Sequence, residues 1–413
     1  MSMNMLAKRF LSGVLCGALL FACSGCVSAP ADGPQDPLPS EEQKLELLTV
    51  YGGETVDLCP PLLRQYLEED DFDAQCAFLL EHEGENFDYQ NISFAWEEDG
   101  SELYSVYFSK DASFTHSYVV QTEENSLAGG FFAAGQTYYW KVESEFANSE
   151  TDHFYTDDEP GGFLQIDSIA NVRDIGGWST ESGGTVRRGM VYRGSQLNGY
   201  DGAPPLSERG VQQLRDVLGV VGEIDLRTAG VDDADQTKNY LCAEAPYLKA
   251  AFHPYTHLIP QYEKFDPHRH FDDRVPAAFR SIFAFLSDES NYPLYMHCNA
   301  GADRTGTLAF ILNGLLGVSY EDLTKDFEIT SFTVMGNRWR GSAEGGFTDG
   351  VMSDDYEHTY VAWGKMYELF MEYYATSSGL LSDAIENWLL TACGVPQTQI
   401  DKFCQIMLTE EIV

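Results

Sequence analysis

The chain has 413 residues, with 65 Asp and Glu against 25 Lys and Arg, so its formal net charge at pH 7 is −40. Nucleic acids and anionic lipid surfaces carry charge of the same sign, which argues against both as partners. An anionic substrate would need positive potential that is local to its binding site.

The first 43 residues predict export rather than a folded domain. In the signal segment, residues 1–26, basic residues precede an apolar run over 10–22 that is too short for a comfortable membrane span. The sequences ending at Cys23 and Cys26 resemble the small-residue-then-cysteine box of bacterial lipoproteins, which implies lipid attachment at one of these cysteines. Residues 27–43, rich in Pro, Asp, Ser and Ala, are predicted to be a solvated linker.

The rest of the chain is therefore expected outside the cytoplasmic membrane. It would be a cell-surface lipoprotein that contacts the membrane only through its lipid anchor. The alternatives are simple cleavage of the signal segment with secretion, and retention of the segment as an anchor.

Residues 44–158 are predicted to form a small all-β sandwich domain. Polar and apolar residues alternate, as in half-buried strands, in three segments: 92–96, 104–108 and 138–142. The sequence of residues 134–142 resembles that of a fibronectin type III domain, in which Trp96 would be the core tryptophan. The acidic segment 62–80 does not fit a sandwich and is predicted to be an insertion.

This β-domain contains no catalytic constellation. It would serve as a spacer or as a packing partner for the next domain, or it would present protein or glycan ligands that the sequence does not identify. Cys59 and Cys76 are separated by a short acidic stretch and could form a disulfide outside the cell.

Residues 159–413 are predicted to form an α/β domain with a central, mostly parallel sheet flanked by helices. Helical periodicity over 206–217 precedes a buried strand over 220–226, and such alternation is typical of parallel sheets. Functional residues in these sheets gather beyond the carboxyl ends of the strands. The region from 359 onward is predicted to be helical and to cover the sheet.

Ten residues, 297–306, carry the chemistry. An apolar run over 293–296 predicts a buried strand, and apolar residues at helical spacing follow the segment. A strand, a tight loop and a helix start turn backbone N–H groups inward, which creates a cradle for an anion. Cys298 would be stabilised there as a thiolate, and the planar fork of Arg304 can hold two phosphate oxygens. The pattern predicts a phosphoryl-transfer site.

The motif His-Cys-x5-Arg-Thr-Gly at 297–306 resembles the signature loop of the cysteine-dependent protein tyrosine phosphatases. With Asp303 before the arginine, it is similar to the bacterial atypical tyrosine phosphatases. The same family carries a second matching element, Asn-x-Arg-Asp-x-Gly-Gly at 171–177, ahead of a Tyr-Arg-Ser-like strand at 192–195. The resemblance thus covers about the last 250 residues.

The resemblance implies a two-step covalent reaction that needs no metal and no cofactor. Cys298 would attack phosphorus, Arg304 and the loop amides would hold the phosphate oxygens, and Thr305 would donate to the departing thiolate. The residues expected to bind phosphate are those of the loop: Asn299, Ala300, Gly301, Ala302, Asp303 and Arg304. His297 is expected to orient the loop rather than to act as a base.

The reaction also needs an acid for the departing oxygen. Asp225, in an Asp-Leu-Arg element shared with the family, is the first choice, and Asp303 is the second. Three further aspartates lie in a candidate lid over 252–274: Asp266, Asp272 and Asp273. Each aspartate would otherwise brace the loop by pairing with an arginine.

Three residues outside the loop are expected to support it. Arg173 and Asp174 are predicted to form a structural pair that braces the loop, and Arg227 lies with Asp225 at the end of a strand that can face Cys298.

The candidate lid contains four of the nine histidines: His253, His257, His268 and His270. They are expected to form a less acidic rim over the phosphate site. A metal cluster is the alternative, although Pro254 and Pro260 argue against the regular helix that would bring two rings to one face.

The loop has Ala302 where related phosphatases that act on phosphoinositides often carry a lysine. Loss of that charge favours a substrate with one phosphate, either a phosphorylated protein or a small phosphomonoester. Phosphotyrosine is the first choice, because a long aryl ester reaches the base of a deep pocket. The alternatives are an inositol phosphate or phosphoinositide phosphatase, and a module that binds phosphorylated ligands without turnover.

Overall fold

The computed structural model describes residues 44–199, 204–229, 238–261, 271–336, 338 and 358–409. These ranges all fall within one compact unit, residues 43–413. Several predictions lie outside the described residues: the signal segment, the linker, lipid attachment at Cys23 or Cys26, and the roles of Asp266, His268 and His270. No helix in the described ranges combines the length and the apolarity that crossing a bilayer demands.

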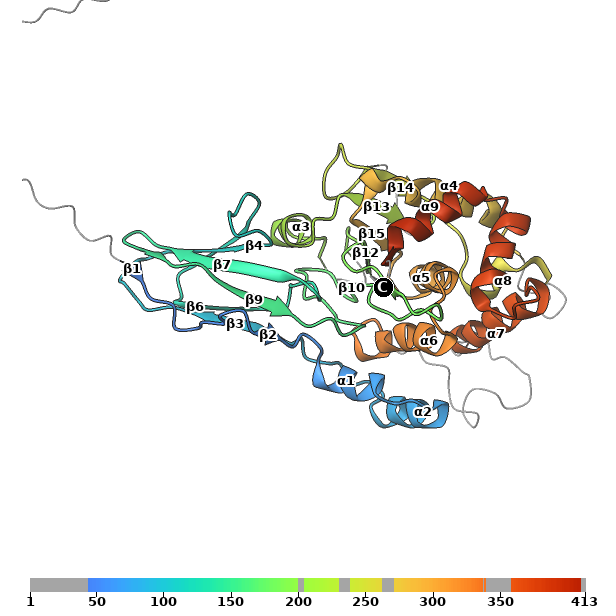
Figure 1. Cartoon of the computed structure of the whole chain (residues 1–413), viewed down its shortest axis with the longest axis horizontal. Helices are drawn as coiled ribbons and strands as arrows, with labels where there is room; N and C mark the ends of the chain where they lie inside the picture. Colours follow the sequence, from blue (N-terminus) through green and yellow to red (C-terminus); the bar gives the residue numbers. More distant parts are fainter. Residues whose placement is uncertain are drawn as a thin grey trace, which may run out of the picture. The chain divides into compact units, whose positions relative to one another are not determined.

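The N-terminal part is built from short strands, most of them antiparallel (Figure 1). Seven strands share one sheet: β1 (Lys44–Leu45), β2 (Thr55–Val56), β4 (Tyr104–Ser109), β5 (Tyr118–Thr122), β7 (Thr137–Glu143), β8 (Asn148–Ser149) and β9 (Asp152–Thr156). Two more strands pair separately: β3 (Ile92–Ala95) and β6 (Ser126–Gly129). The three predicted strands are therefore confirmed as β3, β4 and β7. The likeness to a fibronectin type III domain stays a prediction.

The alternation of buried and more exposed side chains explains why these segments are strands. In β7 every second side chain is buried, and its central Trp140 donates from Nε1 to Asp152 at 3.2 Å. Phe94 of β3 packs edge to face on Trp140, with ring centroids 4.8 Å apart. Trp96 is fully buried in the same core.

The C-terminal part has the predicted α/β architecture. Its central sheet has the order β10 (Arg173–Asp174), β12 (Val191–Gly194), β15 (Leu294–His297), β13 (Gly222–Asp225) and β14 (Tyr247–Lys249). Only β10 runs antiparallel to its neighbour, so the sheet is mostly parallel, as expected. A small additional sheet joins β11 (Thr185–Val186) to β16 (Leu408–Thr409).

The helices of this part are α3 (Glu208–Gln212), α4 (Val275–Leu286), α5 (Asp303–Leu315), α6 (Tyr320–Glu328), α7 (His358–Tyr373), α8 (Leu381–Trp388) and α9 (Gln397–Met407). Wide π turns extend α3 through Gln213–Val217 and α8 through Leu389–Cys393. A 3₁₀ turn, Ile329–Phe332, follows α6 directly.

The central sheet is covered on both faces. Successive residues of β15 point to opposite sides: Leu294 and Met296 join the core formed with α4, α5 and α7–α9, whereas Tyr295 joins the other core. That second core also contains Leu214 beside α3 and the buried side chains of the N-terminal strands. The N-terminal strands thus share one hydrophobic core with the α/β sheet.

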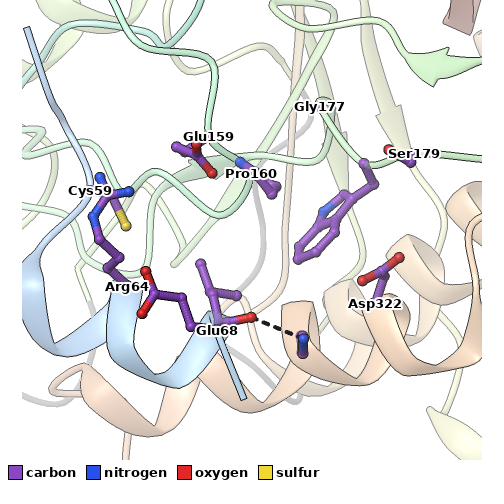
Figure 2. A pocket seen from close by; sticks show the side chains of 11 residues that line it. Cys59, Arg64, Glu68, Glu159, Pro160, Gly177, Ser179 and Asp322 are labelled. Atoms are coloured by element: carbon purple, nitrogen blue, oxygen red, sulfur yellow. Dashed lines mark hydrogen bonds between the residues drawn. The ribbon is translucent and has the colours of Figure 1, made fainter. Parts of the chain in front are cut away.

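The predicted insertion consists of two short helices, α1 (Pro61–Leu67) and α2 (Phe72–Glu81). Helix α1 lies beside α6 (Figure 2), where Lys325 donates from Nζ to the carbonyl of Leu67 at 2.9 Å. On α2, Nε2 of Gln75 lies 3.5 Å from Oε1 of Glu321 of α6. The phenol of Tyr66 donates to Oε2 of Glu328 at 2.5 Å, and both side chains are fully buried. A pocket of about 300 Å³ lies between α1, α6 and the chain around Gly177.

Cys59 and Cys76 are both buried and are not joined to each other, so the disulfide considered from the sequence is absent from the structure. Burial raises the pKa of the Cys59 thiol to about 12, which keeps it protonated and unreactive at neutral pH.

Two carboxyl groups meet where β2 and β9 end. Because these strands run parallel, Asp57 and Asp157 leave the sheet side by side. Arg64 of α1 lies 2.5 Å from Oδ1 of Asp57 and 3.7 Å from Oδ2 of Asp157. Partial burial and the hydrogen bond with Asp57 raise the pKa of Asp157 to about 6.

We expect an Asp157→Asn variant to gain stability relative to the wild-type chain as the pH rises from about 4 to about 7. A raised folded-state pKa means that the fold favours the protonated carboxyl. The stability from this proton is therefore present below the unfolded-state pKa and is lost as the pH rises through about 6. Asparagine cannot ionise, so it avoids that loss.

Urea unfolding at several pH values measures the difference in free energy of unfolding. An Asp158→Asn variant, which removes an exposed charge next in the chain, is the control. A stability difference between Asp157→Asn and the wild-type chain that does not change with pH would contradict the raised pKa of Asp157.

Candidate active site

The signature loop connects the end of β15 to the start of α5, as its motif predicts. Cys298 opens the loop and is only 2% exposed. Gly301 sits at its turn with φ of +70°, and a Cβ there would lie 2.2 Å from the carbonyl oxygen of Gly194 at the end of β12. Only glycine permits both this backbone conformation and this close approach.

The carbonyl groups of the loop are held from outside. Arg193 donates from Nη2 to the carbonyls of Gly301 at 2.8 Å and Ala302 at 3.3 Å. Asn171 donates from Nδ2 to the carbonyl of Ala300 at 3.1 Å. Because C=O and N–H point in opposite directions along a peptide, these bonds turn the loop amides toward the inner side. Amides turned inward in this way are the groups that the expected anion cradle requires.

One carboxylate holds the arginine braces in place. Asp326 of α6 accepts from Nε of Arg173 at 3.0 Å and from Nη1 of Arg193 at 2.6 Å. Arg173 also donates from Nη1 to Asn171 at 2.5 Å. Burial alone would raise the pKa of Asp326, but the two guanidinium groups outweigh it and lower that pKa. Sequence reasoning found Arg173 as a brace and missed Asp326, whose helix carries no motif.

The expected pair of Arg173 and Asp174 does not form. The two residues are neighbours on β10, so their side chains point to opposite sides. Asp174 instead accepts from the backbone N–H groups of Gly176 at 2.8 Å and Gly189 at 2.5 Å. It shapes a turn and does not brace the signature loop.

Arg304 is half-buried in the first turn of α5. It donates from Nη2 to Oδ1 of Asn299 at 2.8 Å, across the loop. Its Nη1 lies 3.5 Å from the carbonyl of Leu226, just past β13. The guanidinium therefore lies beside the cradle, where its fork can reach an anion.

His297 is held by contacts on both ring nitrogens, and its expected role in orienting the loop stays a prediction. Its Nε2 lies 3.1 Å from Oε1 of Glu223, its Nδ1 lies 3.3 Å from the carbonyl of Cys298, and both side chains of the His297–Glu223 pair are fully buried. Sequence reasoning missed Glu223, which faces His297 from the adjacent strand, β13, two residues before Asp225.

Thr305 lies behind the loop. Its hydroxyl is fully buried and has no hydrogen-bond partner among the described residues. A buried hydroxyl without a partner is costly, so a thiolate or a bound oxygen is the partner that the site chemistry offers. The predicted bond between Thr305 and the thiolate of Cys298 stays a prediction.

The structure contradicts Asp225 as the acid. It is fully buried and accepts from Nε and Nη2 of Arg227 at 2.9 and 2.8 Å, from Nζ of Lys249 at 3.0 Å and from the phenol of Tyr247 at 3.0 Å. Burial would raise the pKa of Asp225, but Arg227 and His297 outweigh it and hold that pKa far below its usual range. Full burial and donors on both oxygens make Asp225 unsuited to transferring a proton to a substrate.

Asp225 instead positions Arg227, one of the expected supporting residues. Arg227 is fully buried and donates from Nη1 to Oδ1 of Asn198 and, at 3.3 Å, to Oε1 of Gln196. The backbone N–H of Gln196 in turn donates to the carbonyl of Asn299 at 2.9 Å. Arg227 thus supports the loop through one intermediate residue.

Asp303 has the accessible position that Asp225 lacks. It begins α5, and its side chain is 31% exposed. Oδ1 accepts from the phenol of Tyr255 at 2.7 Å and from Nε of Arg338 at 3.0 Å. Sequence reasoning missed both partners, which lie 48 and 35 residues away along the chain.

The two described aspartates of the candidate lid, Asp272 and Asp273, are less suited to acid chemistry. Asp272 is buried and paired with Arg274 through bonds of 2.9 and 2.8 Å. Burial would raise its pKa, but the hydrogen bonds from Arg274 outweigh it and lower that pKa. Asp273 is exposed just before α4.

The two described lid histidines lie close together. The rings of His253 and His257 have centroids 5.3 Å apart. Burial and the neighbouring Arg274 lower the pKa of His253, although Asp272 opposes the shift. Within the described ranges, no three side chains of His, Cys, Asp or Glu converge on a point where a metal ion would bind.

We expect a Gly301→Ala variant to bind inorganic phosphate at least about tenfold more weakly, because its Cβ displaces the loop from Gly194. Gly317→Ala is the matched control. Gly317 also has positive φ, +87°, but a Cβ there meets nothing closer than 3.8 Å. Calorimetric titration with phosphate measures both. Equal affinities for the two variants would contradict the role of this close approach.

The sequence matches a known protein family and a curated relative. Residues 164–409 match the family described as the tyrosine phosphatase family. A protein of Cupriavidus necator, named as a candidate tyrosine-protein phosphatase, is 27% identical over 176 residues, which span 40% of this chain and 61% of that protein. This chain therefore matches less than two thirds of that relative's length.

Among solved structures, the core catalytic domain of a PP-IP phosphatase from S. cerevisiae, in complex with citrate, matches with 11% identity and a TM-score of 0.25. The match covers 41% of this chain and 79% of that chain. The family match covers more than half of the chain and includes both the β12 region and the signature loop. The chain belongs to the tyrosine phosphatase family.

Proposed function

We propose that this chain hydrolyses phosphomonoesters, with phosphotyrosine in proteins as its principal substrate, through a phosphocysteine intermediate. The observation that carries the proposal is the signature loop itself. Cys298 lies at its start, Arg193 and Asn171 tie its carbonyls outward, and Arg304 lies beside it. Inward amides and a guanidinium are the groups that stabilise charge on a transferring phosphoryl group.

In the first step, Sγ of Cys298 attacks phosphorus and the bond to the ester oxygen breaks. An acid gives its proton to that oxygen, which leaves as an alcohol or a phenol. In the second step, water attacks the phosphocysteine, the same carboxylate takes a proton from the water, and the thiolate departs. The buried hydroxyl of Thr305 donates to that thiolate.

Asp303 is the acid in this proposal. It stands at the loop's own end, it is partly exposed, and one of its oxygens has only a long contact. Asp225, by contrast, is a fully buried carboxylate with donors on both oxygens. A carboxyl group that must gain and lose a proton in each turnover needs the first environment.

A single phosphate on a protein tyrosine fits the loop best. Ala302 supplies no charge for a second phosphate, and on a chain of net charge −40 further phosphates would meet repulsion. The related Cupriavidus necator protein is named as a candidate tyrosine-protein phosphatase. A panel of phosphotyrosine peptides, inositol phosphates and phosphoinositides tests this specificity, and faster turnover of an inositol phosphate would overturn it.

We also propose that the enzyme acts outside the cytoplasmic membrane, tethered through a lipid on Cys23 or Cys26 or secreted after cleavage. The support is the signal pattern of residues 1–26. Metabolic labelling with a fatty acid distinguishes the lipidated form from the secreted one.

In this proposal the N-terminal strands form a fibronectin type III-like domain.

Replacing Cys298 with serine should lower turnover by more than about a thousandfold while phosphate binding persists, because the hydroxyl is a far weaker nucleophile than a thiolate. Cys404→Ser, at a half-buried thiol on α9, is the control. Turnover assays with calorimetric phosphate titration measure both effects. Substantial activity in Cys298→Ser would rule out a phosphocysteine intermediate.

The identity of the acid is tested by the leaving group. We expect Asp303→Asn to lose about a hundredfold or more on a phosphotyrosine peptide, whose phenol needs a proton, and little on 2,4-dinitrophenyl phosphate, whose phenol does not. Asp225→Asn should affect both substrates alike, since Asp225 only positions Arg227. If Asp225→Asn showed the leaving-group dependence instead, the two roles would be exchanged.

A further inference from the structure

Tyr255 reaches the site in an unusual backbone conformation. Its φ is +58°, in the left-handed region that non-glycine residues rarely adopt. The conformation is held from two sides: its N–H donates to Oγ1 of Thr307 at 3.1 Å, and its ring packs edge to face on Phe327 of α6, with centroids 6.1 Å apart. Such strain persists where the surrounding structure imposes it, and it is concentrated at functional sites.

The result of this conformation is that a buried phenol is delivered onto Asp303. Tyr255 is only 6% exposed, and its hydroxyl donates to Oδ1 of Asp303 at 2.7 Å. Burial and the carboxylate of Asp303 raise the pKa of Tyr255 well above its usual value. The phenol therefore stays protonated, and it is always a donor to this carboxyl group.

Arg338 approaches the same carboxyl group from another segment. Its backbone N–H donates to Oγ of Ser331 at 2.7 Å, which fixes the chain just beyond the 3₁₀ turn after α6. Its Nε donates to Oδ1 of Asp303 at 3.0 Å, whereas its Nη2 lies 3.3 Å from Oδ2. The side chain of Arg338 is 9% exposed.

The two oxygens of Asp303 are thus unequal. A carboxyl oxygen has two lone pairs in its plane, and Oδ1 uses both, one for Tyr255 and one for Arg338. A proton on Oδ1 would displace one of these donors. Among the described residues, Oδ2 has only the long contact with Arg338, so it is the oxygen that can carry the proton.

We propose that Tyr255 and Arg338 are positioning residues that hold Oδ1 of Asp303, so that Oδ2 presents its proton to the leaving oxygen. This inference rests on the proposed function, with Asp303 as the acid. The proton moves from Oδ2 to the ester oxygen as its bond to phosphorus breaks. In the second step Oδ2 takes a proton from the attacking water, and the two donors keep Oδ1 in place throughout.

The charged and titratable groups around Asp303 determine the sign of the pH effect. Among the described residues these are Tyr255 and Arg338, together with Arg304 beside it on α5 and Cys298 at the start of the loop. Both Tyr255 and Arg338 donate to the ionised carboxyl and favour it. Without either donor the ionised form is less favoured, so the basic limb of the pH profile should shift to higher pH.

The test is a Tyr255→Phe variant, which removes the hydroxyl and keeps the ring against Phe327. We expect kcat on a phosphotyrosine peptide to fall about tenfold with KM unchanged, and kcat on 2,4-dinitrophenyl phosphate to change little. The basic limb of kcat/KM for the peptide should move to higher pH. Arg338→Gln should show the same pattern. In Arg338→Lys, which keeps the charge, the basic limb should lie closer to that of the wild-type enzyme.

Tyr247→Phe is the matched control, because it removes a phenol that donates to the other carboxylate, Asp225, at 3.0 Å. It should affect both substrates alike. Equal losses of kcat on the two substrates for Tyr255→Phe and Arg338→Gln would overturn the positioning role, and so would an unshifted basic limb of the pH profile. In either case the leaving-group dependence of Asp303→Asn would still identify Asp303 as the acid. Absence of leaving-group dependence in Asp303→Asn would instead overturn the proposed function.

Discussion

The signature loop depends on one buried carboxylate. Asp326 holds Arg173 and Arg193, and these arginines, directly or through Asn171, hold three successive loop carbonyls, those of Ala300, Gly301 and Ala302. Loss of one partner in a buried ion pair costs about 3–5 kcal/mol, because the other charge is left without compensation. The loop can therefore keep its amides turned inward only while α6 keeps Asp326 in place.

The same cluster supplies the local positive charge that the proposed phosphate site needs in so acidic a chain. Two guanidinium groups against one carboxylate leave an excess positive charge buried behind the loop. Burial and the charge of Arg193 lower the pKa of Arg173 only to about 10, so Arg173 remains charged at neutral pH. At short range in a buried site this charge outweighs exposed carboxylates that salt and water screen. The net charge of −40 therefore does not exclude local positive charge behind the loop.

Helix α6 also joins the site to the N-terminal part of the chain. Asp326 faces the arginine braces, while Lys325 and Glu328 of the same helix bond to Leu67 and Tyr66 of α1. The sequence marked this insertion only as a segment that does not fit a sandwich. Its packing on α6 could not be predicted, because the partners are more than 250 residues apart and no local pattern links them.

Local patterns predicted the strand, loop and helix of the site, because each depends on residues within a few positions of one another. They also favoured Asp225 as the acid, because it belongs to an Asp-Leu-Arg element shared with the family. Yet Asp225 and Arg227 are two residues apart on an extended segment, so their side chains point the same way, and their pairing was within reach of sequence reasoning. Lys249 and Tyr247 come from the neighbouring strand, whose register only the structure reveals.

The contrast between the two aspartates shows how one residue type serves two purposes. Asp225 receives donors on both oxygens, including two cationic side chains, and this fixes it as an anion that positions Arg227. Asp303 receives its close donors on one oxygen, and its side chain remains partly exposed to solvent. Acid and base chemistry needs a carboxyl group whose protonated form is accessible, and a structural ion pair needs the opposite. The distribution of donors over the two oxygens, more than the sequence around either residue, therefore decides which aspartate can transfer a proton.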